Sequence, residues 1–451
     1  MFEKKRSALI VALMLCLAAT SFANGAAEEE QRATQLKYVY WGSTAEDEAI
    51  KNALSGFESA NPGISVEPMY LPGDLDGSTY NARMTTMAAS GTLPDLGYFR
   101  PEEFGNYATN GYFMDLTDLV ERDGMDEAYL PQTWLSIDGS IYGAYTAAEC
   151  QVMWYNPAVL EQAGVPVPPT DYRDAWTWDE FVGYLRQITV DANGNHPGDA
   201  GFSANNIETY GVAYDLWVAM YYPTIWSSGG DVFNADGTDT LIDSPESIEA
   251  IQRLADLIHE EQVMPYMGGG SGLPSPTVML QNEQLGFYVT GQWTLLELGG
   301  MDDLDLGVAA LPIQETPAQL YVSGINVVFE ASENPEDAWS LQKWMMDPSK
   351  TLDLYTSGLW MPTKQSYYTD PADLARWIDN PVHPEGYREA IVDSMEIART
   401  EPIMVRNYNQ IWGDHLTPAM ESIWIGQDSA QEALTAAAEA LRESGLLEGM
   451  Y

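Results

Sequence analysis

The sequence predicts an α/β protein built from two domains. Segments of strand type alternate with segments of helical periodicity along the chain, a pattern typical of α/β domains with a mainly parallel sheet. At 451 residues the chain is too long for one hydrophobic core, so two domains are expected. Hydrophobic residues make up 45% and charged residues 19%, which is ordinary for a folded globular protein.

The first predicted elements follow one another at short spacing. Helical spacing of Ile50, Leu54 and Phe57 predicts an amphipathic helix, and acidic residues fill its first turn. The Asn-Pro-Gly stretch at residues 61–63 ends this helix. The expected order is a strand at 36–43, a helix at 44–60, a strand at 64–71, a helix at 79–91 and a strand at 93–99.

The same alternation continues with longer elements. Thr177, with Glu180 three residues later, predicts a capping box at a helix start. Ser244 caps another helix that has Pro245 at its first position. The remaining predictions are a strand-like segment at 140–156, a helix at 157–164, a strand at 285–289, two helices within 334–358 and a final Ala-rich helix within 428–445.

The N-terminus has the features of a secretory signal peptide. Lys4, Lys5 and Arg6 precede an apolar run at residues 8–19, and a small-x-small cleavage site ends at Ala23. We therefore expect an exported protein from which residues 1–23 are removed. No later run reaches 18 uninterrupted apolar residues, so no spanning helix is expected in the mature chain.

The two cysteines predict neither a disulfide nor a lipid anchor. Cys16 lies in the expected signal peptide, but Leu15 stands where lipoprotein processing requires a small residue. After cleavage Cys150 remains alone, so no internal disulfide is expected. Its strand-like neighbourhood favours packing as a small hydrophobe over a nucleophilic role.

The charge balance excludes two classes of partner. Lys and Arg total 20 against 67 Asp and Glu, a formal net charge of −47. Nucleic acid and anionic membrane surfaces would be repelled by this field. We therefore expect no nucleic-acid partner and an acidic surface spread over the folded domains.

No motif indicates an enzyme or a metal protein. The sequence lacks the short serine-hydrolase, zinc-protease and phosphate-loop motifs, and its four histidines have no ligand spacing. A glycoside hydrolase would need two positioned carboxylates, which 67 acidic residues neither single out nor exclude. Asp191, Asn193 and Asn195 have part of a calcium-loop pattern, but the later ligand positions are missing, so a plain turn is expected. We expect no metal and no cofactor.

Four tryptophans stand out among 14 Trp and 26 Tyr. Trp41, Trp226, Trp293 and Trp360 each follow an apolar segment beside a glycine or a polar turn. Rings at such loop mouths suit sugars, because a pyranose has an apolar face that stacks on a ring and a rim of hydroxyls. The alternative for each of them is ordinary buried packing.

The ordered motifs resemble a known family. Segments such as "YVYWGS", "FESANPGISVEPMY" and "ARMTTMAASGTLPDL" near the start are followed by "NGYFMDLTDLV", "GFYVTGQW" and "VSGINVVFE". Each motif is weak alone, but the ordered set covers essentially the whole mature chain. It resembles bacterial extracellular solute-binding proteins of the carbohydrate type, the maltose-binding-protein-like receptors of ATP-binding-cassette importers.

The resemblance implies a two-lobed periplasmic-binding-protein fold with hinge crossovers and a central ligand cleft. The first crossover is expected near Glu149 and the return near residues 306–312. The implied division is a signal peptide at 1–23, lobe 1 at 24–148, lobe 2 at 149–311, a lobe 1 return at 312–361 and a helical segment at 362–451 that lies mainly in lobe 2.

The resemblance also implies ligand-binding residues. Trp293 and Trp41 are expected to stack on a sugar, and Glu149 to accept hydrogen bonds from hydroxyl groups. Gly324 and Asn326 are expected where the backbone must come close to the ligand. The full predicted set is Trp41, Asp95, Tyr145, Glu149, Trp226, Trp293, Gly324, Asn326, Trp360 and Arg406.

The implied function is that of an exported, monomeric, non-catalytic binding protein. It would capture a sugar or oligosaccharide, close around it by a hinge movement, and deliver it to the transmembrane permease subunits of an ATP-binding-cassette importer. Two alternatives stay open: a secreted carbohydrate-active hydrolase, and a receptor of the same fold for a peptide, polyamine or polyol phosphate.

Overall fold

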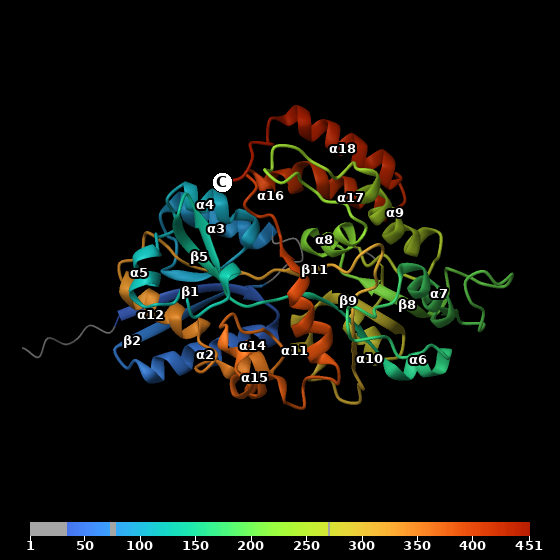
Figure 1. The fold of residues 1–451 in the computed structure, drawn as a ribbon, viewed down its shortest axis with the longest axis horizontal. Helices are drawn as coiled ribbons and strands as arrows, with labels where there is room; N and C mark the ends of the chain where they lie inside the picture. Colours follow the sequence, from blue (N-terminus) through green and yellow to red (C-terminus); the bar gives the residue numbers. More distant parts are fainter. Residues whose placement is uncertain (1–33, 73–77, 269–270) are drawn as a thin grey trace, which may run out of the picture.

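The computed structural model of the protein describes residues 34–72, 78–268 and 271–451. The expected signal peptide and Cys16 lie outside these residues. Two α/β lobes stand side by side, one in blue and teal and one in green and yellow (Figure 1). In the three described stretches, no helix is long and apolar enough to cross a membrane. The predicted α/β class and the two-lobed architecture are confirmed.

The first lobe is built on a six-stranded sheet in the order β2-β1-β3-β12-β5-β4. β1 runs parallel to β2 and β3, whereas β12 enters antiparallel from far along the chain. The strands are β1 (Thr34–Gly42), β2 (Ile64–Pro72), β3 (Leu96–Phe99), β4 (Trp134–Ile137), β5 (Ser140–Tyr145) and β12 (Ile325–Val328).

Helices pack against this sheet as the apolar periodicity predicts. Ile50, Leu54 and Phe57 are the buried residues of α2, and Asn61 caps its end. The helices of this part are α2 (Thr44–Ala60), α3 (Ser78–Ser90), η1 (Pro101–Glu103), α4 (Phe104–Thr109), α5 (Thr117–Arg122), η2 (Pro131–Thr133), α12 (Pro335–Met346) and α13 (Leu352–Thr356).

The second lobe has a five-stranded sheet in the order β10-β6-β9-β8-β7. Its strands are β6 (Gln151–Tyr155), β7 (Val190–Asp191), β8 (Ile207–Tyr214), β9 (Leu285–Gly291) and β10 (Gly307–Ala309). Its helices are α6 (Pro157–Ala163), α7 (Trp178–Ile188), α8 (Val218–Ser227), α9 (Pro245–His259), α10 (Pro276–Gln281), η3 (Gln292–Thr294) and α11 (Leu295–Leu298). The predicted capping box of Thr177 and Glu180 is present at α7.

The prediction of one strand-like segment over residues 140–156 is wrong. The chain leaves the first sheet at Tyr145 and enters the second at Gln151, so the run is two strands joined by a crossover. Residues 146–150 are buried like the strands on either side, so local periodicity does not mark the crossover that the resemblance placed near Glu149. Cys150 lies at its end, fully buried, and burial raises the pKa of its thiol well above the usual range.

Three chain segments pass between the sheets. Glu149 in the first crossover forms an antiparallel bridge with Val322 in the return segment. The third segment contributes β13 (Ala398–Thr400), which pairs in parallel with β11 (Gln319–Tyr321) of the return segment. β11 lies between the two lobes in Figure 1. These pairings form the natural hinge region.

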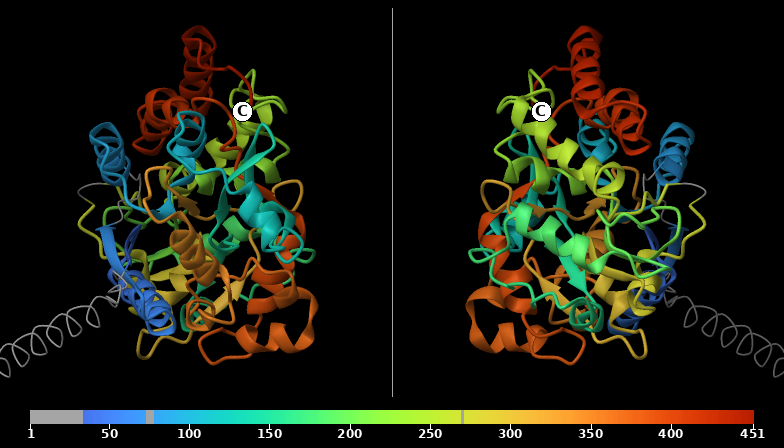
Figure 2. Two further views of the ribbon diagram at one scale, coloured as in Figure 1. Left: turned by 90° about the vertical axis from the view of Figure 1, so that its left-hand side faces the viewer. Right: turned by 90° about the vertical axis from the view of Figure 1, so that its right-hand side faces the viewer.

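The C-terminal part contacts both lobes. α17 and α18 pack on α9, whereas α16 contacts η1 of the first lobe. The Tyr451 hydroxyl donates to Asn106 Oδ1 of α4 over 2.9 Å, and the red helices lie above both sheets in Figure 2. The elements are α14 (Ser366–Thr369), α15 (Pro371–Ile378), η4 (Arg388–Val392), η5 (Asp393–Ile397), α16 (Tyr408–Ile411), η6 (Trp412–Leu416), α17 (Thr417–Trp424) and α18 (Ala430–Ser444).

Candidate functional site

A cavity lies between the lobes and is lined by residues of both, and the space between two packed domains is a common place for small-molecule sites. It opens at the carboxyl ends of β1, β3, β8 and β9, the edge where open α/β sheets bind ligands. Aromatic rings and carboxylates dominate its lining. The lining residues are Trp41, Glu46, Tyr98, Arg100, Pro101, Glu102, Glu149, Asp215, Trp217, Trp293, Val322, Ser323 and Gly324.

One wall of the cavity is a stacked aromatic pair from the first sheet. Trp41 and Tyr98 lie parallel, with ring centroids 3.9 Å apart and an interplanar angle of 4°. Gly324 fits beside them only because it has no side chain: a Cβ there would lie 1.9 Å from the Tyr98 ring and 2.5 Å from the Trp41 ring. The pair therefore depends on a glycine that follows it by more than 200 positions.

The opposite wall comes from the second sheet. Trp293 follows the end of β9 and folds back over Gly291, where a Cβ would come within 2.1 Å of its ring. Trp217 precedes the first turn of α8. Both rings line the cavity and are only partly buried. Trp293 therefore faces the space between the lobes and is not core filler.

The hinge crossovers form the floor. The Glu149 N–H donates to the Val322 carbonyl over 3.1 Å, and the Val322 N–H donates back over 3.0 Å. The Ser323 hydroxyl accepts from the Ala147 N–H at 3.2 Å. This short pairing holds the Glu149 side chain at the base of the cavity.

Two of the lining carboxyls, Glu149 and Glu46, have pKa values that burial raises close to neutral pH. The pKa of Glu149 is raised to about 8, mainly by burial and to a smaller extent by the Glu46 charge, while a hydrogen bond with the Ser323 side chain lowers it in part. Burial likewise raises the pKa of Glu46 to about 7, opposed by a backbone hydrogen bond from Ser43. Perturbed carboxyls gathered in a cleft are typical of a functional site.

The other two lining carboxyls have protein partners. Arg100 pairs with Glu102 at 3.2 Å, and both side chains are buried. Asp215 accepts from the Tyr288 hydroxyl at 2.8 Å and from the Thr290 hydroxyl. Burial raises the pKa of Asp215, and these two hydrogen bonds lower it in part. Of the residues described, Arg100 is the one basic side chain in the lining.

The structure brings four of the ten predicted residues together. Trp41, Glu149, Trp293 and Gly324 all line the cavity. The other six do not line it, and they fall into three situations.

Asp95 lies at the opposite edge of the first sheet. It precedes β3, whereas the cavity lies beyond the carboxyl end of that strand. Its carboxylate accepts from the Lys37 N–H at 2.8 Å and from the Ser332 hydroxyl at 2.6 Å. Asp95 therefore ties neighbouring loops together.

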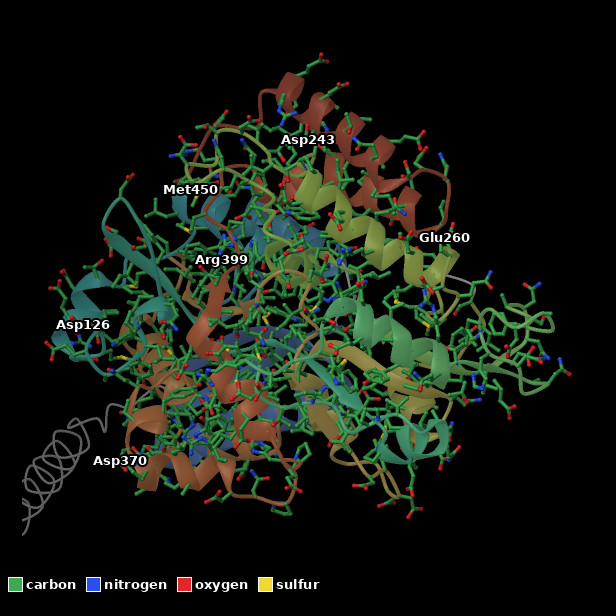
Figure 3. All side chains as sticks on the ribbon, turned by 45° about the vertical axis from the view of Figure 1, so that its right-hand side comes forward. Asp126, Asp243, Glu260, Asp370, Arg399 and Met450 are labelled. Atoms are coloured by element: carbon green, nitrogen blue, oxygen red, sulfur yellow. The ribbon has the colours of Figure 1, made fainter. Side chains whose placement is uncertain are left out.

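Trp226 lines a different hollow, at the far end of α8. Its indole N–H donates to Asp231 at 3.0 Å. Arg399, labelled in Figure 3, lies 4.2 Å from the Trp226 ring centroid and pairs with Asp231 at 2.6 Å. Arg406 is also occupied elsewhere: it donates to the Met450 carbonyl and lies over the Tyr451 ring.

Tyr145, Asn326 and Trp360 are buried below the cavity lining. Trp360 is fully buried and meets the Tyr98 ring edge-on at 5.8 Å between centroids. Asn326 accepts from the Tyr38 hydroxyl at 3.2 Å, and Tyr145 packs edge-on against Tyr321. Trp360 thus supports the stacked wall through Tyr98, and none of the three residues lines the cavity.

Sequence reasoning missed Glu46, Tyr98, Arg100, Asp215 and Trp217. Arg100 directly follows β3 and Asp215 directly follows β8. The rule that ligands meet the carboxyl ends of parallel strands could have found both. Pro101, Glu102, Val322 and Ser323 complete the residues that the sequence did not single out.

The described residues of the site form no metal-binding cluster. In the described ranges, no group of three His, Cys, Asp or Glu residues is placed to hold a metal ion. In the loop with a partial calcium pattern, the Asp191 carboxylate accepts from the N–H groups of Asn193, Asn195 and Ser203. Protein donors thus occupy that carboxylate.

Two α/β lobes around an aromatic cavity define a two-lobed ligand-binding protein. Residues 52–383 match the model of the bacterial extracellular solute-binding protein family, and the chain belongs to this family. It is 25% identical over 437 residues to a putative binding protein of Brucella abortus, covering 94% of this chain and 96% of that relative.

Solved structures share the fold. An ABC substrate-binding protein of Listeria monocytogenes in complex with cycloalternan matches with a TM-score of 0.77 and 23% identity, covering 91% of this chain and 98% of that chain. Maltose-bound MalE3 of T. maritima matches with a TM-score of 0.74 and 22% identity, covering 91% and 100%. The predicted family and fold are confirmed.

The buried Glu149 carboxyl should make stability depend on pH. Its pKa is raised from 4.5 to about 8, so the unfolded chain loses this proton first and folding stability falls as pH rises between those values. Glu149→Gln removes the effect. Urea unfolding at several pH values measures this effect. The unfolding free energy of the variant should rise relative to that of wild type by at most about 1.4 kcal/mol per pH unit in that window.

The matched control is Glu48→Gln, on the exposed face of the same helix as Glu46. It removes one charge without emptying a buried carboxyl site, and its stability should follow wild type at every pH. A constant difference between Glu149→Gln and wild type across the window would contradict the assignment.

Proposed function

We propose that this protein captures a sugar or short oligosaccharide outside the cytoplasm and delivers it to an ATP-binding-cassette importer. One observation carries the proposal: aromatic rings from both lobes face a single cavity with carboxylates between them. The rings suit the apolar faces of a pyranose, and the carboxylates can accept from its hydroxyl groups. Two of the matching structures hold a sugar, cycloalternan in one and maltose in the other, which supports this assignment.

The mechanism we propose is hinge closure. Trp41 and Tyr98 come from one sheet and Trp293 from the other, so a ligand that touches both walls favours the closed arrangement. The segments around Glu149 and Val322 would act as the hinge. The closed protein, an exported monomer freed of residues 1–23 and without a lipid anchor, would be recognised by transmembrane permease subunits.

We assign ligand contact to residues from both walls and the floor. The four sequence-predicted residues that line the cavity are retained, and five more join them. The proposed set is Trp41, Glu46, Tyr98, Glu149, Asp215, Trp217, Trp293, Ser323 and Gly324.

A thermal-shift screen of the chain from residue 24 onward against mono- and oligosaccharides tests the function. A ligand at 100 times its dissociation constant adds about 2.7 kcal/mol of stability, which is readily seen as a higher melting temperature. Stabilisation by peptides or polyol phosphates, with none by any sugar, would contradict a sugar receptor.

The best sugar from the screen should stay chemically unchanged on prolonged incubation with pure protein. This experiment distinguishes a receptor from a hydrolase. The distinction is needed because a glycosidase also uses a carboxyl with a raised pKa, such as that of Glu149, as its general acid. Chromatography of the sugar before and after incubation measures the outcome. Steady hydrolysis that Glu149→Gln abolishes would favour the hydrolase alternative.

Ligand should make the protein more compact. Contacts across the cavity form fully only when the lobes are together, so small-angle scattering should give a smaller radius of gyration at saturating sugar than without it. Asn409 of α16 donates to Glu103 of η1, a contact between the lobes that opening would break. An unchanged radius at saturation would count against hinge closure.

Trp293 and Trp360 should separate binding from stability. Trp293 lines the cavity, whereas Trp360 is fully buried. Trp293→Ala should weaken sugar binding ~30-fold, corresponding to about 2 kcal/mol for a central aromatic contact. Trp360→Ala should instead cost about 3–5 kcal/mol of unfolding free energy.

Calorimetric titration and urea unfolding of both variants measure the two effects. Binding to Trp293→Ala that stays close to wild type, with unfolding as easy as in Trp360→Ala, would mean that the Trp293 ring is structural.

A further inference from the structure

We propose that the preferred sugar carries a protonated amine, so that the cavity selects an amino sugar over its neutral analogue. This inference rests on the proposed sugar-binding function and narrows its ligand class. It is carried by the charge of the lining, by the aromatic walls and by the arrangement of the one basic side chain.

The lining is strongly acidic. It contains the carboxylates of Glu46, Glu102, Glu149 and Asp215 against the single guanidinium of Arg100. Arg100 is already paired with Glu102 at 3.2 Å. In the described part of the chain, three carboxyls therefore line the cavity without an ion-pair partner.

Hydrogen bonds from the protein reach all three carboxyls but bring no positive charge, and among the described residues Glu46 accepts only from the Ser43 N–H of the α2 capping box. Asp215 accepts from Tyr288 and Thr290. Glu149, which is 5% exposed, has the side chain of Ser323 as its hydrogen-bonding partner. A carboxylate in such a place is costly to bury unless a cation joins it, and the cavity leaves room for a ligand to supply that cation.

The groups facing Glu149 are Glu46 from α2, Tyr98 from β3, Tyr321 from β11 and its neighbour Cys150. All of them are acids, and each becomes harder to ionise beside a charged carboxylate. The groups that shift the pKa of Glu149 include no basic side chain. A positively charged group on the ligand would therefore be attracted to this position.

The aromatic walls favour the same ligand. Four rings line the cavity, those of Trp41, Tyr98, Trp217 and Trp293. The faces of such rings attract an ammonium group within about 6 Å, and the same faces stack on a pyranose. A neutral sugar can stack on the rings and donate hydroxyl groups to the carboxylates. An amino sugar can in addition form an ion pair with a lining carboxylate.

The net charge of the whole chain points the same way. With 67 acidic against 20 basic residues, the field around the protein attracts cations and repels anions. A polyol phosphate or an acidic sugar would approach against this field and then meet a lining without a free guanidinium.

The experiment compares three disaccharides with the same linkage: one with free amines, one with N-acetylated amines and one with hydroxyls in their place. Calorimetric titration should give the amine form at least about tenfold tighter binding than either neutral form. Between about pH 5.5 and 7, below the usual pKa of amino groups, affinity for the amine form should rise with pH because binding favours ionised Glu149 and Glu46. Affinity for the neutral forms should not rise.

Glu149→Gln keeps the shape of the side chain and removes its charge. It should weaken binding of the amine form at least about tenfold more than it weakens binding of the neutral forms, because the Gln carbonyl can still accept from their hydroxyl groups but carries no charge for the ammonium. Glu48→Gln removes an exposed charge from α2. It should leave the affinity for all three disaccharides unchanged, and so it controls for the effect of the protein's net charge. The melting temperature of each variant without ligand shows that it is folded.

Two results would overturn the inference, and they differ in what they leave standing. Equal or tighter binding of a neutral disaccharide, or equal weakening of all three by Glu149→Gln, rejects the amine requirement but keeps a sugar receptor. Binding of none of the three disaccharides, with stabilisation by a linear diamine that lacks a sugar ring, rejects both the amine sugar and the proposed sugar-binding function.

Discussion

The backbone pairing of Glu149 with Val322 is the contact on which the site depends. These residues exchange two N–H···O bonds of 3.1 and 3.0 Å where the chain passes from one sheet to the other and back. The Thr146 N–H extends the pairing by donating to the Gly324 carbonyl at 3.0 Å. Each side of this short ladder leads into a strand, so its register is transmitted to both sheets. On one side Gln151 pairs with Gly291, which sets the place of Trp293; on the other, Ile325 pairs with Phe99 and brings Gly324 against Tyr98.

The same contact explains why buried carboxyl groups and glycines occupy positions that apolar side chains would fill in an ordinary protein core. A core at this position would hold apolar side chains of matched volume, but the crossover instead places a buried carboxylate beside a second one, Glu46. Gly291 and Gly324 leave the space that the Trp293 ring and the Trp41–Tyr98 pair occupy. Conflicts of this kind between local rules and the fold concentrate at functional sites. Their cost is offset by the two large, well-packed lobes that hold the crossovers in place.

The sequence predicts the fold well because strands and helices follow local periodicity, whereas the site depends on distant neighbours. Trp293, Trp226 and Trp360 share one local pattern, an apolar segment ending near a glycine or polar turn. Of these three only Trp293 lines the cavity, because Trp226 lies at the far end of α8 beside Arg399 and Asp231 and Trp360 is fully buried against the Tyr98 ring. Nothing within a few residues of each tryptophan encodes these outcomes. Local periodicity likewise merged β5 and β6 into one strand-like run, because the crossover between them is buried as deeply as the strands it joins; only the family resemblance placed a crossover near Glu149.

The proposed closure and the proposed charge selection both follow from one arrangement. The aromatic walls belong to different sheets, while Glu149 belongs to the hinge between them, so a ligand that fills the cavity meets the carboxylate as the lobes come together. Closing expels water, and interactions between charges strengthen as the local dielectric falls. A cation on the ligand would therefore stabilise the closed form most, and a ligand without one would leave the carboxyl at the hinge protonated or unpaired. The residue that joins the lobes is in this way also the one that can discriminate between ligands.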